Sequence, residues 1–252
     1  MTEIVTKRLD LTHFVELLGP ALTSPEVEQR AKATKLLSET LANLPLDFLT
    51  EVQLNFVATF YCDRLKDQHS VVPATLAGIQ VLCRMTQLPE GQAARLLQAI
   101  FQNVPCQSQV RGDRECIFEI LKSLSENKSQ ELLAMGTDFV YGVINAIDGE
   151  RDPRILLFLY EYLPSFLKTF PLGHLAEEMF EVIACYFPID FNPSPNDPKA
   201  ITRDFLADKL SDCLCANEAF ADNCIGLLLE KLDSQLSVAK FDSLMLLVSA
   251  TD

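Results

Sequence analysis

The sequence predicts an all-α fold: a right-handed α-solenoid, or α-α superhelix, built from about six antiparallel helix pairs. Three observations predict it. The 252 residues include only 9 Gly and no Trp, and Leu, a strong helix former, dominates the apolar set. Helix ends recur at a regular spacing along the chain. A capping side chain followed by Pro recurs where helices begin.

The regular spacing is that of the apolar residue that closes one helix of each pair, just before a polar turn. These closing residues are Leu22, Leu65, Val104, Ile147, Phe187 and Leu232. They are separated by about 43, 39, 43, 40 and 45 residues, close to the ~40–47-residue period of HEAT and armadillo repeats. The spacing therefore predicts a single HEAT-like solenoid over residues 1–252.

Each predicted unit is a pair of helices joined by a short turn. In chain order the pairs are residues 9–22 with 25–44, 48–65 with 70–87, 90–104 with 112–126, 129–147 with 153–168, 172–187 with 198–215, and 218–232 with 236–249. Ser24-Pro25, Asp152-Pro153 and Asp197-Pro198 each supply an N-cap acceptor and a Pro at the first helical position, where the missing N–H is tolerated. Ser70 is expected to cap the second helix of the second unit.

Two further features support individual elements. The helix predicted over residues 70–87 carries an apolar stripe at steps of three and four residues, formed by Val72, Leu76, Ile79 and Cys83. Pro164 is expected to bend or shorten the helix predicted over 153–168. The last helix ends on the apolar run 244–248 without a polar capping face. Because such a face normally stacks on another repeat, we expect the chain to be the N-terminal part of a longer protein.

The charge and composition exclude several function classes. The net charge of −14, from 21 basic and 35 acidic residues, repels phosphate backbones and disfavours direct nucleic-acid binding. No apolar stretch approaches the ~20 residues that span a bilayer, and the N-terminus does not resemble a secretory signal. Eight cysteines without such a signal indicate reduced thiols. We therefore expect a protein of the cytoplasm and nucleus.

A catalytic, cofactor or metal site is not expected. His13, His69 and His174 fall in three different repeats, too far apart to act together. Cys213 and Cys215 lie two positions apart, so on a helix they point about 200° from each other and cannot share one ion. No phosphate-binding loop, nucleophile elbow or zinc-binding helix motif occurs. The sequence predicts a protein that is not an enzyme and has no small-molecule substrate.

Three charged turns are the candidate protein-binding sites, because turns along one ridge of a solenoid commonly form its binding face. The candidate residues are Asp63, Arg64, Lys66 and Asp67 in the first turn, Asp148, Glu150, Arg151, Asp152 and Arg154 in the second, and Ile189, Asp190, Phe191, Asn196 and Asp197 in the third. The third turn is stiffened by four prolines, which would preorganise it for recognition. Alternatively, Ile189 and Phe191 pack back on the helices.

The same turns carry a resemblance to a known family. The motifs RLKD at 64–67, DGERDPR at 148–154, CYFPIDF at 185–191 and PNDP at 195–198 resemble the N-terminal region of the methyl-methanesulfonate-sensitivity-nineteen family. AIFQ at 99–102 and LEKLDS at 229–234 do so too. The order and spacing of these motifs extend the resemblance along nearly the whole chain.

The resemblance implies a HEAT-repeat adaptor of the cytosolic iron–sulfur assembly targeting complex. Such an adaptor joins smaller assembly proteins and recruits apo iron–sulfur clients, including repair helicases and polymerases. It also implies links to DNA repair and transcription. In this family the C-terminal part, absent here, docks the assembly partners.

Two other function classes remain open from the sequence. Acidic HEAT solenoids also serve as nuclear transport receptors, which would bind the small transport GTPase. A metal-binding or redox module would instead hold iron after anaerobic purification.

Overall fold

The computed structural model describes residues 11–192 and 201–249, and over these residues the chain is helical with no strand. In the described ranges, thirteen α-helices are accompanied by three 3-10 helices, at Cys106–Ser108, Gly173–Leu175 and Glu218–Phe220. The chain divides into two compact units, residues 1–134 and 135–252, which are described separately as unit 1 and unit 2. The expectation of a single solenoid over residues 1–252 stays a prediction.

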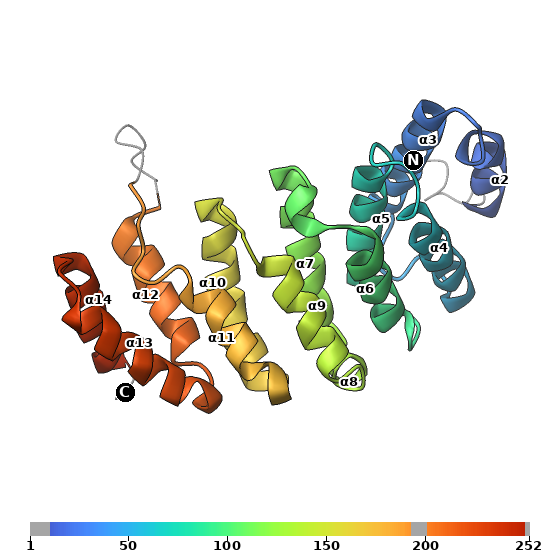
Figure 1. The fold of residues 1–252 in the computed structure, drawn as a ribbon. Helices are drawn as coiled ribbons and strands as arrows, with labels where there is room; N and C mark the ends of the chain where they lie inside the picture. Colours follow the sequence, from blue (N-terminus) through green and yellow to red (C-terminus); the bar gives the residue numbers. More distant parts are fainter. Residues whose placement is uncertain (1–10, 193–200, 250–252) are drawn as a thin grey trace. The chain divides into compact units, whose positions relative to one another are not determined.

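In unit 1, the described residues 11–134 form seven α-helices in two layers (Figure 1). They are α2 (Leu11–Leu22), α3 (Val27–Ala42), α4 (Glu51–Arg64), α5 (Val72–Arg84), α6 (Gln92–Asn103), α7 (Arg111–Asn127) and α8 (Ser129–Leu133). Helix α2 packs on α3, and α4 packs on α5. Helices α3, α5 and α7 follow one another in one layer, and α4, α6 and α8 form the other.

Unit 2 repeats the arrangement, with six α-helices over the part of it that the structure describes, residues 135–192 and 201–249 (Figure 1). They are α9 (Thr137–Ile147), α10 (Pro153–Thr169), α11 (Ala176–Ala184), α12 (Arg203–Leu214), α13 (Ala221–Asp233) and α14 (Ser237–Ser249). Helices α10, α12 and α14 form one layer, α11 packs on α9 and α12, and α13 packs on α14. Both units confirm the predicted all-α fold of successive HEAT-like helix pairs.

Side-chain hydrogen bonds between neighbouring pairs recur at the period of the repeat. Ser38 Oγ donates to the Ala74 carbonyl at 2.7 Å, 36 residues away, and Lys128 Nζ to the Leu88 carbonyl at 2.7 Å, 40 residues away. Between α10 and α12 the separation is longer. Asn217 Nδ2, just after α12, donates to the carbonyl of Leu167, 50 residues away, at 2.7 Å, because the connection before α12 adds residues.

A buried polar contact sets the approach of α3 and α5 in unit 1. Tyr61 from α4 is fully buried, and its hydroxyl lies 2.8 Å from Ser38 Oγ. Gly78 on α5 leaves the space that the Tyr61 ring and Ser38 Oγ occupy, since a Cβ there would overlap both. Burial raises the pKa of the Tyr61 phenol, which stays protonated. Tyr61 therefore joins the two layers through a satisfied hydroxyl.

The aromatic core of unit 2 joins its two layers. Phe139 of α9 meets Phe166 of α10 edge-on, with ring centroids 5.6 Å apart, and meets Phe170 with centroids 5.0 Å apart. All three rings are at most 3% exposed. Fully burying one such side chain contributes about 1.5–3 kcal/mol, and the edge-to-face geometry adds about 0.5–1.5 kcal/mol per pair.

Helix starts agree with the predictions in part. Asp152 caps α10, accepting from the Arg154 N–H at 3.0 Å, with Pro153 at the first helical position, as predicted. Ser24 is not the N-cap of α3: its Oγ accepts from the N–H of Glu26, and the helix begins at Val27. Ser24 therefore stabilises the turn before the helix.

Two other predicted starts were wrong. No side-chain bond caps α5, whose N-cap is Val71 and not Ser70. Helix α12 begins at Arg203 instead of Pro198, and the side chain of Thr202 caps it by accepting from the Phe205 N–H at 3.2 Å. Thr202 satisfies one of the four orphan N–H groups of the helix. The predicted cap at 197–198 lies outside the described residues.

The uninterrupted helix predicted over 129–147 was wrong, and for Pro164 the expected shortening was wrong, whereas the expected bend stays a prediction. The single helix predicted over 129–147 is divided into α8 and α9 at Gly136, whose φ of +60° an L side chain rarely adopts. Pro164 does not shorten α10, which continues to Thr169. Proline has no N–H for the carbonyl four residues earlier, and the freed Tyr160 carbonyl accepts the Cys213 thiol of α12 at 3.3 Å.

Candidate protein-interaction site

The first candidate turn follows α4 in unit 1 and is held by an arginine–aspartate cluster. Arg30 of α3 donates to both Asp67 oxygens, at 2.9 and 2.7 Å, and Arg64 donates to Oδ2 at 2.9 Å. The Arg30 hydrogen bonds hold the pKa of Asp67 below its ordinary value. Asp63 and Lys66 are about 60% exposed and pair at 3.4 Å. Arg64 and Asp67 therefore join two helix pairs, whereas Asp63 and Lys66 face solvent.

The second candidate turn, between α9 and α10 in unit 2, has one buried carboxylate. Glu150 is fully buried, and its Oε1 accepts the backbone N–H groups of Arg151 and Asp152 at 2.8 and 2.9 Å. Asp152 forms a two-point contact with the Arg154 guanidinium, at 2.9 and 2.7 Å. The side chains exposed to a partner are Asp148, Arg151 and Arg154.

The third candidate turn follows α11 in unit 2, and its apolar residues turn inward to different degrees. Ile189 is buried, Phe191 is half-buried and Asp190 is exposed. Arg203 Nε donates to the Ile189 carbonyl at 3.1 Å, and the Arg203 guanidinium also forms a two-point ion pair with the buried Asp242 of α14. The packing of Ile189 agrees with the alternative in which this residue supports the helices.

The structure brings the second and third turns together. The Tyr186 hydroxyl, just after α11, donates to the Glu150 carbonyl at 2.8 Å. Asn196 and Asp197 lie outside the described residues. The first turn belongs to unit 1 and the other two to unit 2, so a shared ridge stays a prediction.

Sequence reasoning missed the residues that anchor these turns. Arg30 lies 37 residues before Asp67, and Arg203 lies 39 residues before Asp242. Tyr186 lies 36 residues after Glu150. All three separations are close to the repeat period. A search for complementary side chains one repeat apart would have found the two arginine–aspartate pairs, but not Tyr186, which donates to a backbone carbonyl.

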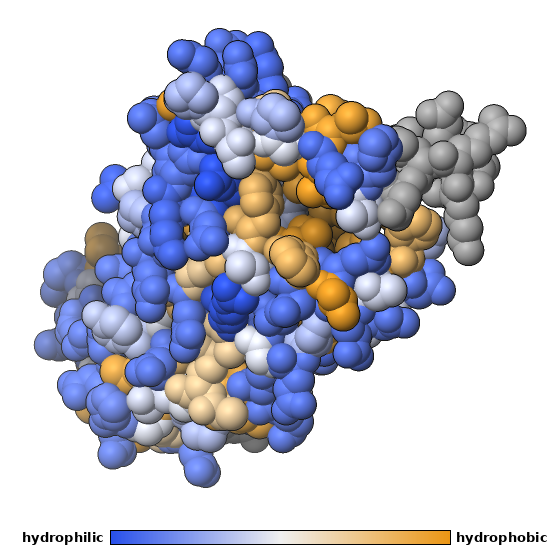
Figure 2. All heavy atoms as spheres, turned by 90° about the vertical axis from the view of Figure 1, so that its right-hand side faces the viewer, coloured by the Kyte–Doolittle hydropathy of each residue, from blue (hydrophilic) through white to orange (hydrophobic). Residues whose placement is uncertain are grey.

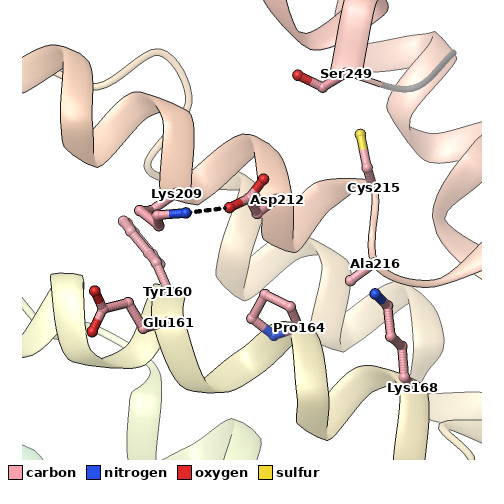
Figure 3. A pocket seen from close by; sticks show the side chains of 9 residues that line it. All are labelled: Tyr160, Glu161, Pro164, Lys168, Lys209, Asp212, Cys215, Ala216 and Ser249. Carbon is pink, nitrogen blue, oxygen red and sulfur yellow. Dashed lines mark hydrogen bonds and ion pairs between the residues drawn. The ribbon is translucent and has the colours of Figure 1, made fainter. Parts of the chain in front are cut away.

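A surface cavity of about 490 Å³ lies between α10 and α12 in unit 2. Figure 3 shows Lys168 of α10 reaching toward the end of α12, and Lys209 joined to Asp212; the latter pair is 2.7 Å apart. Tyr160 also lines the cavity, and its buried hydroxyl has no hydrogen-bond partner among the residues that the structure describes. The charges around the cavity are mixed in sign, which does not select one class of ligand.

The thiols of the described residues are poorly suited to nucleophilic chemistry. Burial raises the pKa of Cys116 to about 12 and of Cys224 to about 11, and it also raises that of the exposed Cys215. A raised pKa reduces the thiolate that attacks an electrophile or binds a metal. Across residues 11–192 and 201–249, no group of three or more His, Cys, Asp or Glu side chains could hold a metal ion.

Exposed apolar side chains are found in both units. Figure 2 views the side that carries the N-terminal helices, where apolar side chains gather in a hollow among hydrophilic ones. In α4, Phe56 is 76% exposed and Val52 is 69% exposed. In α14 the exposed residues include Leu244 and Val248, at 54% and 57%. None of the described helices is both long and apolar enough to cross a membrane.

Comparison with known proteins identifies the family. Residues 15–252 match the family MMS19_N, described as "Dos2-interacting transcription regulator of RNA-Pol-II". The chain is 53% identical to the MMS19 nucleotide excision repair protein of Drosophila melanogaster over 98% of its length, and 41% identical to the human homologue over 92%. A Dictyostelium discoideum homologue is 35% identical over 98%.

The match covers nearly all of this chain but only part of each relative. It spans 26% of the Drosophila protein, 23% of the human protein and 22% of the Dictyostelium protein. The family match over residues 15–252 agrees with the resemblance carried by the motifs at the three turns. The chain therefore belongs to the MMS19 family and corresponds to its N-terminal region.

Proposed function

We propose that this chain is a non-catalytic adaptor segment of the cytosolic iron–sulfur assembly targeting complex. The observation that carries the proposal is the family match over residues 15–252. In this role the segment recruits apo iron–sulfur clients, such as repair helicases and polymerases, to the assembly proteins. The family description refers to transcription and the names of the relatives refer to excision repair, which supports clients of this kind. The proposed place of action is the cytoplasm and nucleus.

The second turn is the part of the surface best suited to client binding. Glu150 and Tyr186 hold its backbone, while Asp148, Arg151 and Arg154 project into solvent. A turn fixed before binding loses less conformational entropy when a partner docks. Charges of both signs on a rigid frame favour a partner with a complementary pattern.

Client recovery tests the proposal. The 252-residue chain, immobilised, is mixed with a purified apo iron–sulfur repair helicase. We expect retention of the helicase, and a loss of at least about tenfold when Asp148→Lys, Arg151→Glu and Arg154→Glu are combined. Asp204→Lys with Lys240→Glu, which reverses two exposed charges on α12 and α14, is the control for charge reversal elsewhere on unit 2 and should retain the helicase.

The possible outcomes test separately whether the segment recruits clients and whether the second turn is the surface that binds them. Retention that survives reversal of the second turn would exclude this turn while leaving the adaptor role. No retention of any apo iron–sulfur client would refute the recruiting role of the segment. Binding of the small transport GTPase in the same assay would favour the transport-receptor function instead.

A further inference from the structure

A groove of about 490 Å³ runs between α3 and α5 in unit 1. The small residues of its lining are Ala31, Ser38, Ala42, Ser70, Pro73, Ala74 and Ala77, and the larger ones are Lys32, Lys35, Glu39, Gln80 and Val81. The α3 residues recur at helical steps from position 31 to position 42, so the groove follows the helix axis for ~16 Å, at 1.5 Å per residue. The groove is therefore long enough for about three turns of another helix.

The floor of the groove offers few free hydrogen-bonding groups. The Ser38 hydroxyl, the polar group beneath its centre, is already bonded to Tyr61 and to the Ala74 carbonyl. An extended peptide would leave its own N–H and C=O groups against this apolar floor without partners. A helix satisfies its backbone internally and can place an apolar ridge between α3 and α5, at the ~8–10 Å interaxial distance of packed helices. The chemistry of the floor thus favours a helical occupant.

One wall of the groove is basic, in a chain whose net charge is −14. Lys32 and Lys35 of α3 line it and are 75% and 70% exposed. Glu39 of α3 lines it too, so the lining carries two positive charges and one negative charge. Their ion pairs are with Glu28 and Glu39 on the same helix, and exposed pairs of this kind contribute little and exchange easily. Helix α5, the other wall, contains no acidic residue. The wall therefore complements carboxylates on an occupant.

We propose that this groove binds an amphipathic helix of a partner protein that carries glutamate or aspartate beside its apolar stripe. The inference rests on the proposed protein-binding role of the segment, but not on iron–sulfur clients being the partners. It adds a docking surface on the α3–α5 layer of unit 1, distinct from the three charged turns.

Selection from a displayed library of random 16-residue peptides tests the groove. We expect the 252-residue chain to enrich peptides with apolar residues at i, i+3, i+4 and i+7 and acidic residues beside them. A synthetic copy of an enriched peptide should bind at least tenfold more weakly to Ala77→Gln, which fills the groove without changing its charge. It should also bind at least tenfold more weakly to Lys32→Glu with Lys35→Glu.

Matched controls keep the test specific. Ala221→Gln on α13 and Lys240→Glu on α14, both exposed, should leave peptide binding unchanged, and circular dichroism should show that every variant remains folded. Enrichment of peptides without acidic residues, or binding that survives Ala77→Gln, would overturn the proposal, as would a library that yields no binder. If the peptide test fails while the chain still retains the helicase, only the proposed groove site is refuted. If peptides bind the groove as expected but the chain does not retain the helicase, the recruiting role is refuted.

Discussion

Replacing Gly78 by Ala tests how closely α5 approaches the layer beneath it. The added Cβ would overlap the Tyr61 ring and its hydroxyl and would lie 2.6 Å from Ser38 Oγ. Neither neighbour can move freely, because Tyr61 is fully buried and Ser38 is 3% exposed. Overpacking of this kind costs about 1–3 kcal/mol, against a gain of about 1 kcal/mol in helix propensity.

The clash involves the rigid ring itself, so the overpacking cost should lie at the upper end of that range. We expect Gly78→Ala to lower the free energy of unfolding of unit 1 by about 1–2 kcal/mol net. Urea denaturation followed by circular dichroism measures this change, provided that the slope of the transition is unchanged. An unfolding free energy within about 0.5 kcal/mol of the parent chain would refute the close approach.

The same substitution at a second helical glycine, Gly226, should raise the free energy of unfolding instead of lowering it. Gly226 lies inside α13, and apart from its chain neighbours and the backbone of its own helix, no atom of the described residues lies within 4 Å of the Cβ that Ala would add there. Gly226→Ala should therefore stabilise unit 2 by about 0.5–1 kcal/mol, through helix propensity alone. Combining Gly78→Ala with Tyr61→Phe should give a non-additive loss, because the two residues are in contact.

Three further changes test individual contacts. Asp67→Asn should lower stability by about 1 kcal/mol after solvent screening. The folded pKa of Asp67 lies below its ordinary 3.8. The stabilisation by the Asp67 carboxylate is therefore fully present above pH 3.8 and is lost as the pH falls through the folded pKa. The melting temperatures of the variant and the parent should converge in acid. Cys213→Ala should cost about 1 kcal/mol by leaving the Tyr160 carbonyl without its donor, whereas the exposed Cys215→Ser should be nearly neutral in chemical denaturation. Tyr186→Phe should cost about 1 kcal/mol and speed hydrogen exchange in the turn that carries Glu150.

The repeat could be predicted from the sequence because each helix pair must bury its apolar face against the next pair. That requirement places an apolar closing residue at the same phase in every unit, and Leu65, Val104 and Ile147 are indeed buried. The points at which individual helices are interrupted were harder to predict. Gly136 separates α8 from α9 although the residues around it favour a helix, because the backbone has a φ of +60° there. A single Gly within an apolar pattern does not reveal its φ, so the sequence did not predict this break.

The candidate turns could be located from the sequence, but the roles of their side chains could not. A run of alternating charges such as residues 148–154 suggests uniform exposure, yet Glu150 is buried. Its carboxylate accepts hydrogen bonds from two backbone N–H groups of its own turn. Every residue except proline has a backbone N–H, so no particular side chain in the sequence marks such a partner. The ion pair of Arg30 with Asp67 does leave one, because its partners are one repeat apart.

Some acidic residues in and beside the candidate turns hold the backbone in place, while other charged residues of these turns are exposed. Asp67, Glu150 and Asp242 are each held by donors from the same turn or from a neighbouring helix pair. Removing one of them leaves a buried donor unpaired and loosens the backbone that positions its exposed neighbours. Variants at these buried acids should therefore weaken partner binding and lower stability together, whereas variants at Asp63, Asp148 or Arg151 should change binding alone. A binding loss at Asp148 that scaled with a loss of stability would show that this separation between frame and contact residues is wrong.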